Sequence, residues 1–172
     1  MELSGKRIAV LAEDRYQELE LWYPLLRLRE AGADVTVVGR ETGKVHISER
    51  NYEVKADIAA SEARAEDYDA IIIPGGYAPD LMRRNPAMVQ LVSKMYQQGK
   101  VVAAICHAGW MLASSGIARG KRLTSVLSIK DDLVNAGATW VDEPVVRDDK
   151  LITSRTPPDL PFFCREIISA LL

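Results

Sequence analysis

Cys106 and His107 are adjacent residues whose side-chain types and spacing suit nucleophilic catalysis. They follow the apolar run 101–105, which is typical of a strand buried on both faces, and precede residues 110–115, which are typical of a helix. Small residues two positions before and after the cysteine permit a sharp strand-to-helix turn, as in a nucleophile elbow. The helix start would favour the thiolate, and its free N–H groups could form an oxyanion hole. This stretch predicts a cysteine nucleophile, the alternative being an inert buried cysteine.

Two further loops are expected beside Cys106, because the carboxyl ends of parallel strands meet at one edge of a sheet. One follows the first strand and carries Glu18 and Glu20, and the other is the Pro-Gly-Gly turn at 74–76. A carboxylic acid close to a thiolate has a raised pKa, and when protonated it can donate a hydrogen bond that stabilises the thiolate. Glu20 is the candidate for that acid, and the alternative is a solvated helix residue.

Metal and nucleotide chemistry have little support. Of the two cysteines and two histidines, only Cys106 and His107 are close in sequence, and adjacent residues rarely chelate one ion, so no metal is expected. His46 is interpreted as a surface residue of a strand. The glycines at 75 and 76 lack the spacing of a phosphate-binding loop and a P-loop is absent, so no nucleotide cofactor is expected either.

The elements that must position these residues alternate between strand and helix, which is typical of a doubly wound, mostly parallel α/β sheet. Hairpins are expected at 45–54 and 144–153. A weak helix is expected at 63–68. Strands are expected at 7–12, 34–38, 70–73, 101–105 and 123–126, and helices at 17–31, 80–84, 86–98, 129–135 and 159–172.

Length and composition are those of one globular domain, 1–172, with 48% hydrophobic and 27% charged residues. The net charge of −2, without a basic block, gives nucleic-acid binding no electrostatic support. No apolar run approaches the ~20 residues that span a bilayer, and the first residues lead directly into a strand, so neither a membrane anchor nor a signal peptide is expected. Two cysteines do not make a disulfide framework, so we expect a reducing cytoplasm.

Four motifs resemble the PfpI family of the DJ-1/PfpI superfamily, which is related to class I glutamine amidotransferases. They are Asp-Ala-Ile-Ile-Ile-Pro-Gly-Gly-Tyr-Ala-Pro-Asp (69–80), Ala-Ile-Cys-His-Ala-Gly (104–109), Ile-Lys-Asp-Asp-Leu-Val-Asn-Ala-Gly-Ala (129–138) and Thr-Ser-Arg-Thr-Pro-Pro-Asp-Leu-Pro (153–161). The resemblance covers almost the whole chain and implies a flavodoxin-like sheet sandwiched between helices. Family members are described as intracellular cysteine peptidases, as deglycases or glyoxalases acting on methylglyoxal and its adducts, and as stress proteins.

The resemblance also implies roles for individual residues. Cys106 matches the family's nucleophile, His107 its general base and Glu20 the glutamate that hydrogen-bonds the cysteine. Gly75 and Gly76 match the loop whose backbone amide lines the oxyanion pocket together with the amide of His107.

Two more positions come from the resemblance alone. Asp80 stands where archaeal peptidases carry a glutamate that reaches the histidine of a neighbouring subunit, so we expect it on an exposed loop and the working unit to be a homo-oligomer, a dimer or trimer of dimers. The alternative is an N-cap for a short helix beginning near Leu81. Arg155 matches a segment near the cysteine pocket.

The sequence departs from the family's pattern at Val126, at Gln17 and at Ala108-Gly109, and these changes remove polar groups from around the pocket. We therefore expect a cysteine hydrolase that needs no cofactor. Small reactive aldehydes or their protein adducts are slightly favoured as substrates, and peptides are the other substrate class. In the alternative, a redox-sensing or chaperone-like stress protein, the same cysteine is oxidised and turnover is small.

Overall fold

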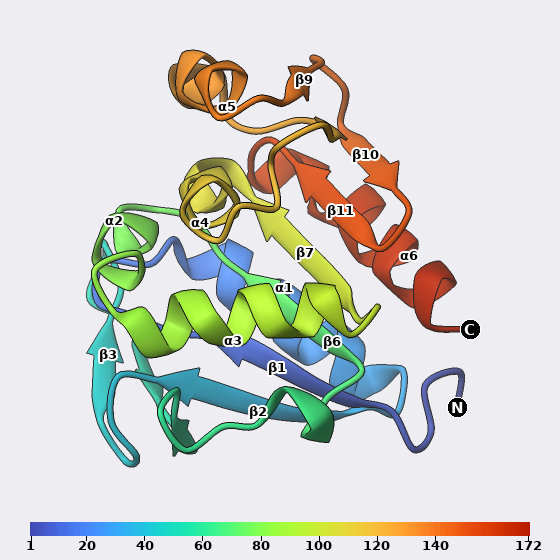
Figure 1. The fold of residues 1–172 in the computed structure, drawn as a ribbon. Coiled ribbons are helices and arrows are strands. Elements are labelled where there is room, and N and C mark those ends of the chain that lie inside the picture. The colour runs from blue at the N-terminus through green and yellow to red at the C-terminus, as the bar shows by residue number, and fades with distance from the viewer.

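The computed structural model describes all 172 residues and contains a seven-stranded sheet with helices on both faces (Figure 1). The strand order is β10-β11-β7-β6-β1-β2-β5, in which only β10 and β11 are antiparallel neighbours. The central strands β1 (Arg7–Leu11), β6 (Ala70–Ile73) and β7 (Val101–Ile105) are apolar almost throughout, because helices cover both of their faces. The predicted doubly wound α/β fold is confirmed.

The remaining strands extend this sheet or form two small ribbons. In the main sheet these are β2 (Asp34–Gly39), β5 (Ile58–Ala59), β10 (Val145–Asp148) and β11 (Leu151–Ser154). The ribbons pair β3 (Val45–Ile47) with β4 (Glu53–Lys55), and β8 (Arg122–Leu123) with β9 (Thr139–Trp140). Both predicted hairpins are present.

Four of the six helices cover the sheet: α1 and α6 lie on one face, and α3 and α4 on the other (Figure 1). α1 continues through Pro24 and ends before Gly32, whose φ of 98° stops a helix. The helices are α1 (Glu18–Glu30), α2 (Ala78–Met82), α3 (Pro86–Gln97), α4 (Gly109–Ser114), α5 (Lys130–Asn135) and α6 (Leu160–Leu171). None of them combines the length and the apolar character needed to cross a membrane.

Two predicted elements are different in the structure. The weak helix at 63–68 is a single 3-10 turn, Ala65–Asp67. The strand predicted at 123–126 is shortened to β8 and lies outside the main sheet, because the backbone N–H of Thr124 donates to the hydroxyl of Thr153 instead of continuing a strand ladder.

The order of the three central strands determines where chemistry can occur. β7, β6 and β1 are consecutive neighbours, so the loops at their carboxyl ends emerge side by side. These loops contain the Cys106-His107 pair, the Gly75-Gly76 pair and the residues that lead to Glu20. The topology thus brings together the three segments that the sequence singled out.

Candidate active site

Cys106 lies at the sharp turn that follows β7. Its φ is 62°, a left-handed conformation that a non-glycine residue rarely adopts, and the chain enters a 3-10 turn (Cys106–Ala108) before α4. Ile105 immediately before it is still extended, so the reversal occurs at the cysteine itself. This is the geometry of a nucleophile elbow, in which strain at one residue presents its side chain above the sheet.

His107 contacts the cysteine through one ring nitrogen and a serine through the other. Its Nδ1 lies 3.4 Å from the Cys106 Sγ, and its Nε2 lies 3.2 Å from the Ser128 Oγ. Burial lowers the pKa of His107, although the negative charge of Glu49 acts to raise it. The imidazole is therefore neutral near pH 7. The sequence contains no signal for Ser128, which is an exposed serine outside every recognised motif.

Glu20 is fully buried, so the interpretation as a solvated helix residue is wrong. Its Oε2 accepts a hydrogen bond of 2.8 Å from the backbone N–H of Gly75. Its buried Oε1 has no hydrogen-bond partner, and the Cys106 thiol is a neighbouring group that influences the carboxyl. A buried carboxylate oxygen without a donor is costly, so this arrangement favours the protonated acid.

The protonation of this pair is set mainly by burial. Burial raises the pKa of Glu20 to about 7, while the hydrogen bond from Gly75 opposes the shift. Burial, and then the negative charge of Glu20, raise the pKa of the Cys106 thiol to about 12. While Glu20 is ionised, burial and the charge of Glu20 therefore favour the thiol over the thiolate that the helix start was expected to favour.

Two backbone amides favour negative charge at the sulfur. The N–H groups of His107 and Gly76 both donate toward Cys106 and oppose the rise of its pKa. The amide of Gly75 is already bound to Glu20. The Gly76 and His107 amides are therefore the candidates for the predicted oxyanion pocket, whereas the Gly75 amide is engaged by the acid.

Glycine is required at both loop positions for steric reasons. A Cβ on Gly75 would lie 2.4 Å from the Glu20 Oε2 and 2.7 Å from the Cys106 Cβ. Gly76 has a φ of 77°, and a Cβ there would lie 2.5 Å from the backbone nitrogen of Gln17. The pair lets the loop approach both the acid and the nucleophile.

A cavity of about 260 Å³ opens above the cysteine. The guanidinium of Arg15 stacks on the ring of Tyr77 at its wall, 4.2 Å from the ring centroid. The cavity is lined by Arg15, Gln17, Glu20, Glu49, Gly76, Tyr77, Cys106, His107, Trp110 and Pro157. Its size suits a small molecule better than a long peptide.

Arg155 and Asp80 do not line this cavity. Arg155 donates to Asp159 and Asp142 at 2.8 Å each, so its guanidinium is engaged by carboxylates. Its segment does lie near the cysteine pocket, as expected, because Pro157 lines the cavity.

Asp80 is neither on an exposed loop nor at an N-cap: it lies within α2 and pairs with Arg84 one turn later. The expected placement of Asp80 was therefore wrong, because a local ion pair holds its side chain.

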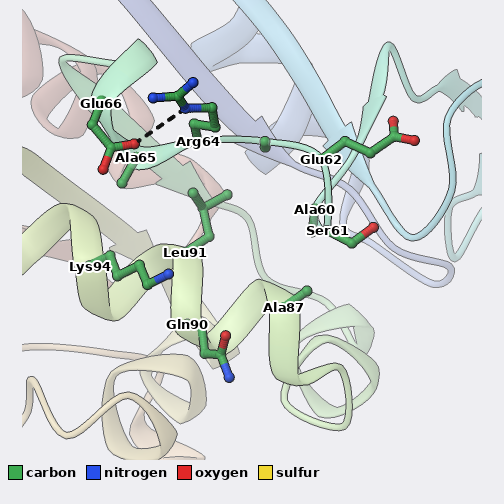
Figure 2. A pocket seen from close by; sticks show the side chains of 11 residues that line it. Ala60, Ser61, Glu62, Arg64, Ala65, Glu66, Ala87, Gln90, Leu91 and Lys94 are labelled. Atoms are coloured by element: carbon green, nitrogen blue, oxygen red, sulfur yellow. Dashed lines mark ion pairs between the residues drawn. The ribbon is translucent and has the colours of Figure 1, made fainter.

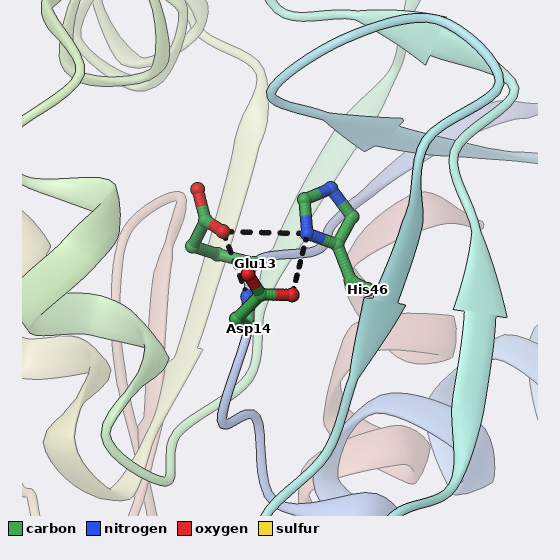
Figure 3. A group of neighbouring side chains, drawn as sticks. All are labelled: Glu13, Asp14 and His46. Carbon is green, nitrogen blue, oxygen red and sulfur yellow. Dashed lines mark hydrogen bonds and ion pairs between the residues drawn. The ribbon is translucent and has the colours of Figure 1, made fainter.

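His46 is completely buried, so its interpretation as a surface histidine was also wrong. The β3–β4 hairpin folds over the loop after β1, and His46 Nδ1 lies 3.3 Å from both Glu13 Oε1 and Asp14 Oδ1 (Figure 3). Arg40 donates to both Glu13 oxygens, at 2.9 and 2.6 Å, and its backbone N–H donates to His46 Nε2. Because the Arg40 guanidinium already binds the Glu13 carboxylate, the cluster is a polar network that holds the hairpin in place. It thereby also fixes the position of Glu49, which lies between β3 and β4.

A second cavity, of about 270 Å³, lies between α3 and the segment 60–66 (Figure 2). Small residues and a weak Arg64–Glu66 ion pair, with 3.7 Å between Nε and Oε2, line it. It contains neither cysteine nor histidine, so the cysteine cavity is the candidate active site.

Comparison with known proteins agrees with this assignment of the fold. A family model described as the DJ-1/PfpI family matches residues 6–170. A Pyrococcus abyssi protein named as a deglycase is 41% identical over 165 residues, which is 96% of this chain and 99% of that protein. Escherichia coli protein/nucleic acid deglycase 2 is 39% identical over 97% of this chain and 98% of its own length.

A solved structure of a related protein has the same fold. The crystal structure of a two-domain Anabaena variabilis protein, with DJ-1/ThiJ/PfpI-like and ferritin-like domains, has a TM-score of 0.95 and 41% identity. The match covers 96% of this chain and 48% of that longer chain. The chain belongs to the DJ-1/PfpI family.

Proposed function

We propose that the protein is a cysteine-dependent hydrolase of small reactive aldehydes, such as methylglyoxal, and of their adducts on protein amines. The observation that carries this proposal is the Cys106 elbow, at which His107 Nδ1 and the buried Glu20 both reach the thiol. The deglycase names of the relatives support the choice of substrate class.

The proposed reaction begins when the Cys106 thiol loses its proton to Glu20 or His107 and the sulfur bonds to the aldehyde carbon. The N–H groups of Gly76 and His107 hold the oxyanion of the resulting hemithioacetal. His107 then removes the proton from the former aldehyde carbon, and a proton is returned to the neighbouring carbonyl carbon. The product of this internal oxidation and reduction is a 2-hydroxyacyl thioester.

Water attacks the thioester carbonyl, the carbon–sulfur bond breaks, and the thiol is regenerated. One methylglyoxal and one water give one lactic acid, so the reaction balances without an external oxidant or cofactor. In an amine adduct, a hemiaminal, the carbon–nitrogen bond breaks as the carbon–sulfur bond forms, and the amine leaves with the proton of the thiol. The cavity of about 260 Å³ supports this substrate class over peptides.

The test is the formation of lactate from methylglyoxal by the wild type, Cys106→Ala and Cys164→Ala, beside hydrolysis of a fluorogenic peptide. We expect lactate formation by the wild type and by Cys164→Ala but not by Cys106→Ala, because Cys164 lies in α6 away from the cavity. Absence of turnover in the wild type, with oxidation of Cys106 by dilute peroxide, would support the redox-sensing alternative instead.

We also propose that the protein works as a homodimer joined through α1. One face of α1 packs on the sheet, yet Leu19, Tyr23 and Leu26 on the opposite face are 55%, 38% and 57% exposed. A helix that is apolar on both faces is normally covered on both. Tyr52 of the hairpin loop adds to this patch beside Trp22.

The charges of α1 favour a second copy as the partner. The first turn contains the acidic Glu18, and the last turn contains Arg27 and Arg29. Glu18 and Arg29 are eleven residues apart, close to three full turns, so they share a flank of the helix. An antiparallel copy related by a two-fold axis near Tyr23 places each acidic turn against a basic one and Leu19 against Leu26.

A further inference from the structure

Ser128 is the residue that faces the second nitrogen of His107. Its hydroxyl oxygen lies 3.2 Å from Nε2, while Nδ1 on the other side of the ring lies 3.4 Å from the cysteine sulfur. Ser128 belongs to the 3-10 turn Leu127–Ile129, which the buried side chain of Ile129 anchors. We propose that Ser128 is a positioning residue that lets His107 exchange between its two neutral tautomers during proton transfer at Cys106.

The argument starts from the burial of His107, which disfavours the charged imidazolium. An imidazole can stay neutral while taking a proton at Nδ1 only if it releases one at Nε2. A serine hydroxyl both accepts and donates, whereas a carboxylate only accepts. Ser128 can therefore accept from Nε2–H while Nδ1 is the base, and donate to Nε2 once Nδ1 carries the proton.

The protons balance in this exchange. The proton of the Cys106 thiol moves to Nδ1, the Nε2 proton moves to the Ser128 oxygen, and the hydroxyl proton moves to water. Ser128 is exposed, so water reaches its hydroxyl. The reverse sequence returns a proton to the cysteine when the thioester is hydrolysed.

The ring of His107 is held so that Nε2 keeps facing Ser128. The Trp110 ring lies 5.0 Å from the His107 ring at an angle of 55°, and Trp110 Nε1 donates to Asp132 at 2.8 Å. The charged groups around His107 are Glu20, Glu49 and Arg15 in the cavity, and Asp132 and Arg83 around Trp110. Asp80 pairs with Arg84, so within the chain Ser128 is the partner of Nε2.

The direct test measures the tautomers by long-range ¹H–¹⁵N NMR correlation of the histidine rings near pH 7.5. The chain has only two histidines, so buried His46 serves as an internal reference. We expect both neutral tautomers of His107 in the wild type, a shift toward the Nε2–H form in Ser128→Ala, and the wild-type populations in Ser128→Thr. Identical tautomer populations in the wild type and Ser128→Ala would overturn the inference.

The second test uses turnover, because the inference rests on the proposed role of His107. We expect kcat with methylglyoxal to fall about tenfold in Ser128→Ala, with KM unchanged since Ser128 does not line the cavity, and to recover in Ser128→Thr. The control Leu127→Ala, at the adjacent exposed position, should match the wild type. An unchanged kcat in Ser128→Ala contradicts the inference. Absence of wild-type turnover contradicts the proposed function, and the NMR test still decides the inference.

Discussion

At the level of single residues, the Glu20 carboxyl and the Cys106 thiol determine each other's protonation. Ionised Glu20 opposes the thiolate, whereas neutral Glu20 can donate a hydrogen bond to it. With a pKa of about 7, Glu20 exchanges a proton readily near neutral pH and is suited to act as acid and base for the cysteine.

This raised pKa predicts a dependence of stability on pH. Burial raises the pKa of Glu20 from 4.5 to about 7, so the folded state binds the proton more tightly than the unfolded state. The stabilisation is complete below pH 4.5 and is lost as pH rises through 7, a loss of about 3 kcal/mol. Urea unfolding at pH 4.5, 6 and 8 should show this loss in the wild type but not in Glu20→Gln, with the exposed Glu30→Gln as control. Parallel curves for wild type and Glu20→Gln would contradict the assignment.

Cysteine reactivity gives a second prediction at this scale. Burial raises the pKa of Cys164 to about 12 as well, but Cys164 is packed within α6, whereas Cys106 lines the cavity. Mild iodoacetamide followed by peptide mapping should therefore modify Cys106 first. Preferential modification of Cys164 would refute the site assignment.

The sequence was sufficient for some of these residues. The apolar run before Cys106 and the small residues around it predicted the elbow, and the topology predicted that Glu20 would be close. Ser128 could not be predicted, because its contact with His107 joins residues 21 positions apart through a short irregular turn. Asp80 was misplaced because its position depends on the ion pair with Arg84, and His46 because its position depends on contacts with Glu13 and Asp14.

At the level of elements, the site depends on loops after three adjacent strands and on the β3–β4 hairpin that covers one of them. The network of Glu13, Arg40 and His46 holds the hairpin, and the Glu49 backbone N–H donates to Tyr16 O at 3.1 Å. The hairpin itself was predictable from turn residues. Its fold-back over the sheet edge was not, because no local pattern specifies which partner a two-stranded ribbon packs on.

The Gly75 loop provides the prediction at this scale. In Gly75→Ala the new Cβ would collide with Glu20 Oε2 and Cys106 Cβ, at 2.4 and 2.7 Å. We expect a loss of about 1–3 kcal/mol of stability and at least a tenfold loss of turnover per folded molecule. Gly99→Ala, where nothing lies within 4 Å of the new Cβ, should cost about 1–2 kcal/mol through its positive φ and leave turnover intact. Equal turnover in the two variants would refute the steric argument.

At the level of the whole molecule, the alternation of strands and helices was enough to predict the sheet, because buried parallel strands have a distinctive apolar pattern. It predicted poorly where elements are short, as at 63–68 and 123–126, since one turn of helix or two residues of strand carry little periodicity. The exposed apolar face of α1 can be recognised in the sequence only once it is known which face of the helix packs on the sheet.

The α1 face predicts a change in assembly. Leu26→Arg places a charge opposite Leu19 in the proposed two-fold contact and should convert a dimer to a monomer in sedimentation velocity, with the fold retained by circular dichroism. Val134→Arg, at an exposed position on α5, is the matched control and should leave the assembly unchanged. A wild type that is monomeric at high micromolar concentration, or a Leu26→Arg dimer, would contradict the proposed interface.

The central claim is that Cys106 forms a covalent bond with the aldehyde, and an acid quench during turnover tests it most directly. Protein mixed with methylglyoxal, quenched after one turnover and analysed by intact mass and peptide mapping, should carry one added methylglyoxal mass. The hemithioacetal and the thioester are isomers, so either gives this increase. The modification should survive the acid quench and map to Cys106. It should disappear on hydrolysis with release of lactate, and it should be absent in Cys106→Ala. Turnover to lactate with no modification of Cys106, or with the same yield in Cys106→Ala, would contradict the account.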